Sequence, residues 1–159
     1  MKNAQELINL LHLEQLETHL FSGQSVTIGS AIVFGGQVLA QAVNAAYRTI
    51  PENRFLHSLH GYFLEAGDLT TDIQYYVEII RNGGSFSTRR ITAKQQEKTI
   101  FILAASFHQR EEGFEHQALM NQDIKQPEEL LSWDEMLAQF GEFLPASTKS
   151  FVLLKVKKL

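Results

Sequence analysis

Residues 34–50 read Phe-Gly-Gly-Gln-Val-Leu-Ala-Gln-Ala-Val-Asn-Ala-Ala-Tyr-Arg-Thr-Ile, and this stretch decides the fold. It predicts one long helix that begins at two glycines and runs to about Ile50, because Pro51 disfavours helical backbone before it. Most of its side chains are small and apolar, which is typical of a helix buried on most of its circumference. The polar exceptions form one narrow stripe on a 3.6-residue period: Gln37, Gln41, Asn44 and Arg48.

The start of this helix is the first candidate site. Gly35 and Gly36 carry no side chain that would cover the first amides of the helix. Free N–H groups and the positive end of the helix dipole suit a carbonyl oxygen or an anion. We therefore predict that Gly35, Gly36 and Gln37 form one wall of a substrate-binding site.

Composition excludes several classes of function. The 159 residues suffice for one domain with a sizeable core, and the net charge of −4 argues against nucleic-acid binding. The chain has no cysteine, which excludes disulfides and thiol chemistry. No apolar run reaches the length of a membrane span, and residues 1–20 lack a signal-peptide pattern. A soluble cytoplasmic protein is the expectation.

The rest of the chain predicts an antiparallel sheet around the long helix. Residues 4–20 have leucines at near-helical spacing, and a strand is expected over residues 26–33. Four strand-like runs follow the helix, joined by short turns, so the sheet is expected to curl around the one helix as an α+β fold. These runs are 54–64, 72–81, 86–94 and 98–108.

The C-terminal part is expected to be organised differently. Residues 117–140 predict a loop and then a helix that starts at Pro127. Residues 151–159 have a simple composition without a turn. They suggest a chain cut short or a tail translated from an altered reading frame.

Two histidines lie in the first strand after the helix. Strand alternation places His57 on one face with Leu59 and Gly61, and His60 on the other face, so one histidine is expected to face the helix. A histidine beside the helix start could orient a water or hydrogen-bond a substrate oxygen. The alternative is a core histidine whose hydrogen bonds are made by the backbone or by Tyr62.

The turn Asn82-Gly83-Gly84-Ser85 is flanked by arginines and hydroxyl groups. Such a turn could bind a phosphate, with Arg81, Arg89 or Arg90 as the cation. Arg89 and Arg90 are adjacent in a strand, so at most one of them serves a given site. The alternative is an ordinary hairpin whose arginines pair with nearby carboxylates.

Other catalytic motifs are missing from the sequence. Glu115 and His116 have no further ligand at a suitable spacing, so no metal site is predicted. No nucleophile elbow and no phosphate-binding loop with a Gly-Lys pair occur, which argues against nucleotide hydrolysis.

Four segments resemble motifs of the acyl-CoA thioesterase II family, in the family's order and at matching separations. The resemblance runs from about residue 5 to residue 120. The four segments are Val33–Val38, His57–Leu64, Arg81–Arg90 and Gly113–Gln117.

The resemblance implies a fold and a function. The family fold is a double hotdog, two tandem domains that each wrap a curled antiparallel sheet around a central helix. Residues 1–120 resemble the first hotdog, and residues 121–150 resemble the start of the linker with a short helix. The implied function is hydrolysis of a fatty acyl-CoA to free fatty acid and coenzyme A, without a cofactor.

The resemblance also limits what this chain is expected to do. The family's catalytic Asp, Ser or Thr, and Gln lie in the second hotdog, so none is carried over. Only an accessory catalytic role follows for His57, with Gly35, Gly36, Gln37, Arg89 and Arg90 as substrate-binding candidates. The chain is expected to bind acyl-CoA, to form homo-oligomers or pair with another hotdog, and to be nearly inactive alone.

Two other functions stay open. The first is a non-catalytic module that binds acyl-CoA or dimerises through the sheet edge left by a missing half. The second is a hotdog dehydratase or a thioesterase with a different base, for which His57 with Glu65 is the one candidate pair.

Overall fold

The computed structural model describes residues 4–27 and 29–145 and divides the chain into two compact units, residues 1–112 and 113–159. The first unit contains every strand of the described residues. Its helices and strands are α1 (Ala4–Leu11), β1 (Glu14–Glu17), β2 (Leu20–Gly23), α2 (Gly35–Tyr47), β3 (Arg54–Phe63), β4 (Ile73–Asn82), β5 (Phe86–Gln95) and β6 (Lys98–Gln109).

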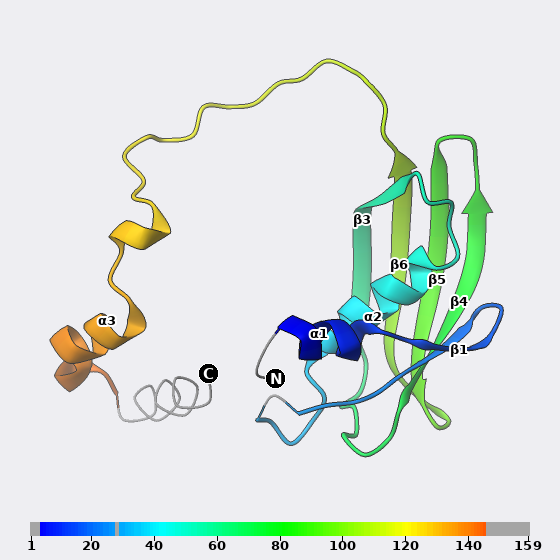
Figure 1. The fold of residues 1–159 in the computed structure, drawn as a ribbon, viewed down its shortest axis with the longest axis horizontal. Coiled ribbons are helices and arrows are strands. Elements are labelled where there is room, and N and C mark those ends of the chain that lie inside the picture. The colour runs from blue at the N-terminus through cyan, green and yellow to red at the C-terminus, as the bar shows by residue number, and fades with distance from the viewer. Residues whose placement is uncertain (1–3, 28, 146–159) are drawn as a thin grey trace. The chain divides into compact units, whose positions relative to one another are not determined.

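The six strands form one antiparallel sheet in the order β1-β2-β4-β5-β6-β3 (Figure 1). β3 to β6 match the four predicted strands to within one residue at each end, so that prediction is confirmed. β3 lies at the edge and pairs with β6, not with β4, the next strand in sequence. The opposite edge is β1, a strand of four residues.

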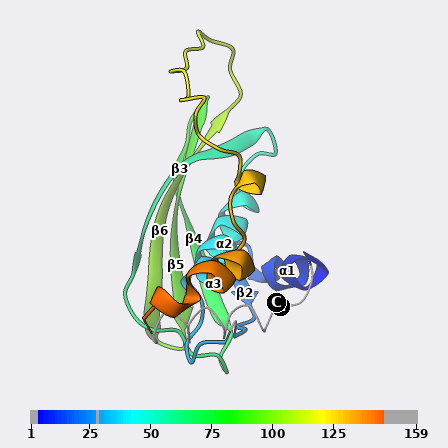
Figure 2. The ribbon, with the colours of Figure 1, turned by 90° about the vertical axis from the view of Figure 1, so that its left-hand side faces the viewer.

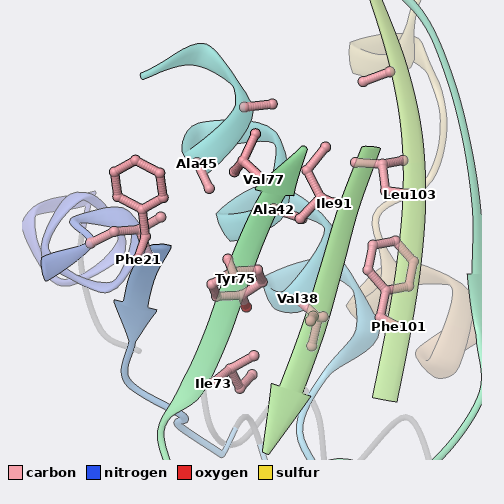
Figure 3. Close-up of a cluster of buried hydrophobic side chains, with 14 of the residues drawn as sticks. Phe21, Val38, Ala42, Ala45, Ile73, Tyr75, Val77, Ile91, Phe101 and Leu103 are labelled. Atoms are coloured by element: carbon pink, nitrogen blue, oxygen red, sulfur yellow. The ribbon is translucent and has the colours of Figure 1, made fainter. Parts of the chain in front are cut away.

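Helix α2 packs against one face of this sheet, which curves around it (Figure 2). Its alanines allow this close approach, since Ala42, Ala45 and Ala46 are fully buried. The strands supply the larger side chains of the core, among them Tyr75, Ile91, Phe101 and Leu103 (Figure 3). The predicted α+β hotdog arrangement is therefore confirmed.

The N-terminal segment differs from the prediction. Residues 4–20 do not form one helix, since α1 ends at Leu11 and β1 and β2 follow. The polar stripe of α2 explains this, because Gln41 donates to Leu10 O at 2.7 Å, Asn44 to Leu11 O at 2.9 Å and Arg48 to Leu13 O at 2.7 Å. The first two of these bonds satisfy carbonyls at the C-terminal end of α1 and so stabilise the end of that helix.

The strand predicted over residues 26–33 is also wrong. Its described residues have no strand structure, and β2 lies earlier, at Leu20–Gly23. The side chain of Gln37 holds this segment by donating from Nε2 to Gln24 O at 2.7 Å. Hydrogen bonds to a side chain of α2 thus replace the expected strand pairing.

The second unit contains short helical elements within residues 113–145. Residues 113–126 are largely irregular, and a 3₁₀ turn spans Pro127–Glu129. Helix α3 covers Trp133–Phe140, so the predicted helix starts later than Pro127. The N-cap Ser132 fixes this start, because its Oγ accepts a hydrogen bond from Glu135 N at 3.3 Å.

Two predictions concern the limits of these units. The sequence placed the end of the first domain at residue 120, and the structure divides the chain after residue 112. The tail predicted over residues 151–159 lies outside the described residues. Within the described part, no helix has both the length and the apolar character needed to span a bilayer.

Candidate functional site

The predicted site begins at the N-terminus of α2. The residue before the helix is Phe34, in an extended conformation and without a side-chain capping bond. Gln37 N and Val38 N both donate to Phe34 O, at 3.0 and 3.3 Å. The amides of Gly35 and Gly36 meet no backbone or side-chain acceptor among residues 4–27 and 29–145. This helix start therefore keeps two donors for another molecule.

Aromatic rings lie against both glycines. A Cβ at Gly36 would come within 2.4 Å of the Phe34 ring, and a Cβ at Gly35 within 3.0 Å of the Phe63 ring. Both residues are at least half exposed, with exposed fractions of 50% for Phe34 and 58% for Phe63. The two amides thus sit beside an exposed apolar rim, which suits an apolar molecule that carries a carbonyl group.

Gln37 has a different role from that of the two glycines. The residue is 5% exposed, and its Nε2 donates to Gln24 O at 2.7 Å. Its Oε1 accepts a longer bond from Val26 N at 3.4 Å. The side chain therefore fixes the segment before the helix, and a substrate-binding role for Gln37 stays a prediction.

His57 and His60 both lie on the face of the sheet opposite to α2, so the prediction that one of them faces the helix is wrong. A β-bulge between Leu56 and Ser58 shifts the alternation of β3 at this residue. His57 Nε2 is 2.8 Å from Ser106 Oγ, and the ring contacts Phe86 with centroids 5.6 Å apart. His60 is also exposed and contacts Tyr62, with ring centroids 4.8 Å apart.

The position of His57 along β3 also separates it from the helix start. Phe63, at the other end of β3, contacts Gly35. Six residues of extended strand span about 20 Å. Within this chain, His57 and the amides of Gly35 and Gly36 therefore do not form one site, and an accessory catalytic role for His57 stays a prediction.

A second histidine and a carboxylate accompany His57. The His57 and His108 ring centroids are 6.0 Å apart, and His108 Nε2 lies 3.3 Å from Glu111 Oε2. Hydrogen bonds from Ser85 and Gln109, and then the charge of His108, hold the pKa of Glu111 below its ordinary value. This outer-face cluster has no hydrogen bond that would orient the second nitrogen of His57 within the described residues.

Glu65 is not part of that cluster. Its carboxylate forms an ion pair with Lys98, at 2.9 Å. Glu65 follows the end of β3, whereas His57 lies near its start. The pairing of His57 with Glu65, on which a dehydratase or an alternative base depends, is therefore wrong.

Arg89 is buried, with 1% of the residue exposed, and all three guanidinium nitrogens donate to the protein. Nε and Nη2 donate to Thr49 Oγ1 and O, at 2.8 and 2.7 Å, and Nη1 donates to Arg81 O at 3.0 Å. Desolvation, and then the charge of Arg54, lower the pKa of Arg89. Arg89 thus joins the strand to the C-terminal end of α2, away from Gly35 and Gly36.

Arg54, at the start of β3, connects that strand to the turn between β4 and β5. Its Nη2 donates to the carbonyls of Gly83 and Gly84 at 2.8 and 2.7 Å, and its Nη1 donates to Ser87 Oγ at 3.0 Å. Its Nε is buried and has no partner among the described residues. Sequence reasoning missed Arg54, since nothing local distinguishes a buried arginine from an exposed one at a strand start.

Arg90 is exposed on the outer face and forms an ion pair with Glu78 of the neighbouring strand. This is the ordinary hairpin arrangement that the sequence left open. α2 covers the other face, so Arg90 and the helix start are not brought together. Substrate-binding roles for Arg89 and Arg90 stay predictions that this geometry does not support.

Two buried amides lie near the helix. Gln41, a member of the predicted polar stripe, is fully buried and accepts a hydrogen bond from Tyr75 Oη at 2.7 Å, and burial raises the pKa of Tyr75. Gln95 is 6% exposed and connects loops at the N-terminal end of α2. Sequence reasoning missed Gln95, whose only signal is a glutamine in strand alternation with core residues such as Ala93.

A cavity of about 280 Å³ lies between α1 and the segment after β2, and no predicted site residue lines it. The cavity lining consists of Glu6, Asn9, Leu10, Gln24, Val26 and Thr27.

In the part of the chain that the structure describes, no three His, Cys, Asp or Glu side chains are close enough to hold a metal ion.

Comparison with known proteins gives a consistent family. The chain is 44% identical to acyl-CoA thioesterase 2 of Haemophilus influenzae over 139 residues, 87% of this chain and 48% of that protein. It is 40% identical to human acyl-coenzyme A thioesterase 8 over 132 residues, 82% of this chain and 41% of that protein.

Solved structures agree with these sequence matches. An acyl-CoA thioesterase II from Mycobacterium marinum superposes with a TM-score of 0.65 at 40% identity, over 73% of this chain and 43% of that one. The chain therefore spans about half the length of the relatives it matches. Because the profile of the acyl-CoA thioesterase N-terminal domain matches residues 22–108, more than half of the sequence, the chain belongs to this family.

Proposed function

We propose that this chain is the N-terminal hotdog of an acyl-CoA thioesterase, an enzyme that hydrolyses a fatty acyl-CoA to free fatty acid and coenzyme A. One observation carries the proposal beyond family membership. The amides of Gly35 and Gly36 lack protein acceptors within the described residues and lie against the exposed rings of Phe34 and Phe63.

The chemistry of thioester hydrolysis explains how this helix start would be used. Attack of water on the thioester carbonyl places negative charge on its oxygen, and two aligned amides with a helix dipole stabilise that charge. The apolar rim formed by Phe34 and Phe63 would take the acyl chain. In this proposal Gly35 and Gly36 act on the carbonyl, and Gln37 acts indirectly by fixing residues 24–26.

The remaining catalytic groups are proposed to come from a second hotdog. A general base typically contributes about 10²- to 10⁴-fold to the rate of such a reaction. Glu65 is paired with Lys98, and Asp68 accepts hydrogen bonds from Thr70, so neither carboxylate is free at the helix start. The isolated chain is therefore expected to bind acyl-CoA and to hydrolyse it very slowly.

We further propose a role in fatty acid metabolism, because the proposed substrate is a fatty acyl-CoA, and a cytoplasmic location.

Release of the coenzyme A thiol tests hydrolysis directly. The protein adds no background to this thiol measurement, since the chain has no cysteine. Purified chain is incubated with octanoyl-CoA or palmitoyl-CoA, and binding is measured separately with a non-hydrolysable thioether analogue. We expect binding of the analogue, and turnover at least about 10²-fold below that of the Haemophilus influenzae relative. Equal turnover would place the base within this chain, and absence of analogue binding would reject the proposal.

A matched pair of variants assigns the binding to the helix start. Gly36→Ala places a Cβ 2.4 Å from the Phe34 ring, whereas Gly84→Ala meets no atom within 4 Å. Analogue affinity is expected to fall about tenfold or more for Gly36→Ala, a change of about 1.4 kcal/mol, and to stay unchanged for Gly84→Ala. Equal affinities in the two variants would contradict the assignment.

A second candidate function is a dimerising module without catalysis. It is favoured by the open edge of β3, a ten-residue strand whose residues 55–63 contain no Lys, Asp, Glu or Pro. Such an edge can pair with another strand. Leu59 and Tyr62 on this strand are exposed.

Light scattering of two edge variants tests this candidate. Leu59→Lys introduces a charge at β3, and Leu16→Lys does the same on β1 at the opposite edge, where the exposed fractions are similar at 39% and 45%. A dimer through β3 is expected to dissociate with Leu59→Lys alone. A wild-type chain that is monomeric at high concentration would exclude it.

A further inference from the structure

The inward-facing side chains of β5 include one polar group near each end of α2. Arg89 donates to Thr49, just after the helix, as described above. Gln95 lies at the other end of the same inward row, where the chain approaches the start of the helix. Between them, Ile91 and Ala93 are fully buried core residues. One strand therefore carries a buried hydrogen-bonding group for each end of the central helix.

The hydrogen bonds of Gln95 are directed at the loop between β3 and β4. Its Oε1 accepts from Asp68 N at 2.7 Å, and its Nε2 donates to Asp68 O at 2.7 Å and to Thr71 O at 2.6 Å. A longer contact of 3.4 Å reaches Ser25 Oγ, which itself donates to Thr71 O. The amide thus binds both the backbone donor and the backbone acceptor of Asp68 and fixes that loop in place.

The same loop holds Val33, which precedes the N-cap residue Phe34. Gly67, next to Asp68, accepts a hydrogen bond from Val33 N at 3.0 Å. Val33 is buried, and a Cβ at Gly67 would lie 3.1 Å from its side chain. Phe34 and Gly35 follow directly, so the position of the loop determines where the first amides of α2 point.

We infer that Gln95 is a positioning residue that aligns the amides of Gly35 and Gly36, acting through the Gly67–Val33 hydrogen bond. The inference rests on the proposed function for its catalytic meaning. It adds a residue from the far end of β5, 59 positions after Gly36, that touches no substrate. Removing its amide is expected to displace the helix start without removing any group that contacts the thioester.

The first experiment needs no ligand. Backbone amide chemical shifts of Gly35 and Gly36 are compared among the wild-type chain, Gln95→Met and Thr49→Val. Thr49→Val removes the Oγ1 that Arg89 Nε uses at the other end of α2, so it is a control for loss of a buried hydrogen bond. Both variants are expected to have a lower unfolding midpoint, but only Gln95→Met is expected to shift the two glycine amides.

A second pair of variants tests the same link without altering a buried amide. Gly67→Ala forces Val33 to move by a few tenths of an ångström, whereas Gly84→Ala meets open space. Gly67→Ala is expected to shift the amide signals of Gly35 and Gly36, as Gln95→Met does, and Gly84→Ala is not. This pair decides the inference if Gln95→Met fails to fold.

Binding of the thioether analogue connects the inference to function. Affinity is expected to fall about tenfold in Gln95→Met and Gly67→Ala, and by less than about threefold in the two controls. Unshifted glycine amides in both Gln95→Met and Gly67→Ala would overturn the positioning role, whatever the wild-type chain binds. Shifted amides in a wild-type chain that binds no analogue would instead reject the proposed function and leave the positioning role supported.

Discussion

Gln41 shows how a single buried amide connects three parts of the first unit. It donates to Leu10 O at 2.7 Å and to Gln24 O at 3.2 Å, and it accepts from Tyr75 Oη at 2.7 Å. Gln41→Leu leaves the Tyr75 hydroxyl buried without its acceptor. We expect a loss of about 2–3 kcal/mol in the free energy of unfolding, measured by urea denaturation.

Gln74→Leu is the control for this prediction. Gln74 accepts a hydrogen bond from Tyr76 Oη in an exposed setting, at 2.8 Å. Its replacement is expected to change the free energy of unfolding by less than about 0.5 kcal/mol. Similar losses in the two variants would show that the buried Gln41 connections contribute little.

Asp68 gives a prediction about pH. Its Oδ1 accepts hydrogen bonds from Thr70 N at 2.6 Å and Thr70 Oγ1 at 2.7 Å, and the backbone bond, followed by the side-chain bond, lowers the pKa of Asp68 below 3.8. This carboxylate therefore stabilises the fold above its ordinary pKa, and the contribution is lost as pH falls through the lowered value. Carboxyl-carbon NMR titration is expected to give a midpoint below 3.8, which rises in Thr70→Val.

Residue-scale roles were the hardest to predict from the sequence. Arg89 was expected to reach a phosphate or a carboxylate, because most arginines are exposed. Its actual acceptors include Thr49, 40 positions earlier, and no local pattern reveals such a pairing. The glycines at the start of α2 were predicted correctly as an uncapped helix start, since that property depends only on adjacent residues.

The hairpin between β5 and β6 carries local backbone strain. Gln96 has φ of 54°, the one positive value among the described non-glycine residues. A side chain in this left-handed region costs about 1–2 kcal/mol, which glycine avoids. Gln96→Gly is therefore expected to raise the free energy of unfolding by about 0.5–1 kcal/mol, and the adjacent Glu97→Gly is expected to lower it. A loss of stability in Gln96→Gly would contradict this account.

Elements with a clear period were predicted, and short or irregular ones were not. The strands β3 to β6 have ten or twelve residues each, long enough for alternation to define them. β1 and β2 have four residues each and were hidden within a leucine pattern that suggested one helix. The bulge at His57 places it on the same face as His60 and not on the opposite one, because alternation holds only while the register is unbroken.

The division into two units gives a prediction for the whole chain. Every buried residue of the described core lies between Leu13 and Phe107, inside the first unit. Limited proteolysis is expected to cut within residues 110–126, where the described chain is exposed and mostly irregular. The fragment that remains should keep the thermal midpoint of the full chain, as measured by circular dichroism. A lower midpoint would show that the second unit stabilises the first.

At this scale the sequence was most informative. Consecutive strands after one long alanine-rich helix allow few arrangements, so the curled sheet around α2 could be predicted. The candidate site could be predicted only in part, because the helix start supplies donors and an apolar rim, and no free carboxylate is found beside it within the described residues. In the proposed function the general base belongs to a second hotdog, so these residues could not predict it.

The spacing of the buried polar groups at the two ends of β5 limits the length of α2. From Arg89 to Gln95 is six residues of strand, about 20 Å, and the 13 residues of α2 span about the same length. The length of α2 therefore matches the distance between Arg89 and Gln95 on the strand. One residue inserted into α2 would rotate the rest of the helix by about 100° and lengthen it by about 1.5 Å. The contacts of Arg89 and Gln95 near the two ends of the helix could then no longer form together. We therefore expect α2 to tolerate an inserted residue less well than exposed turns do.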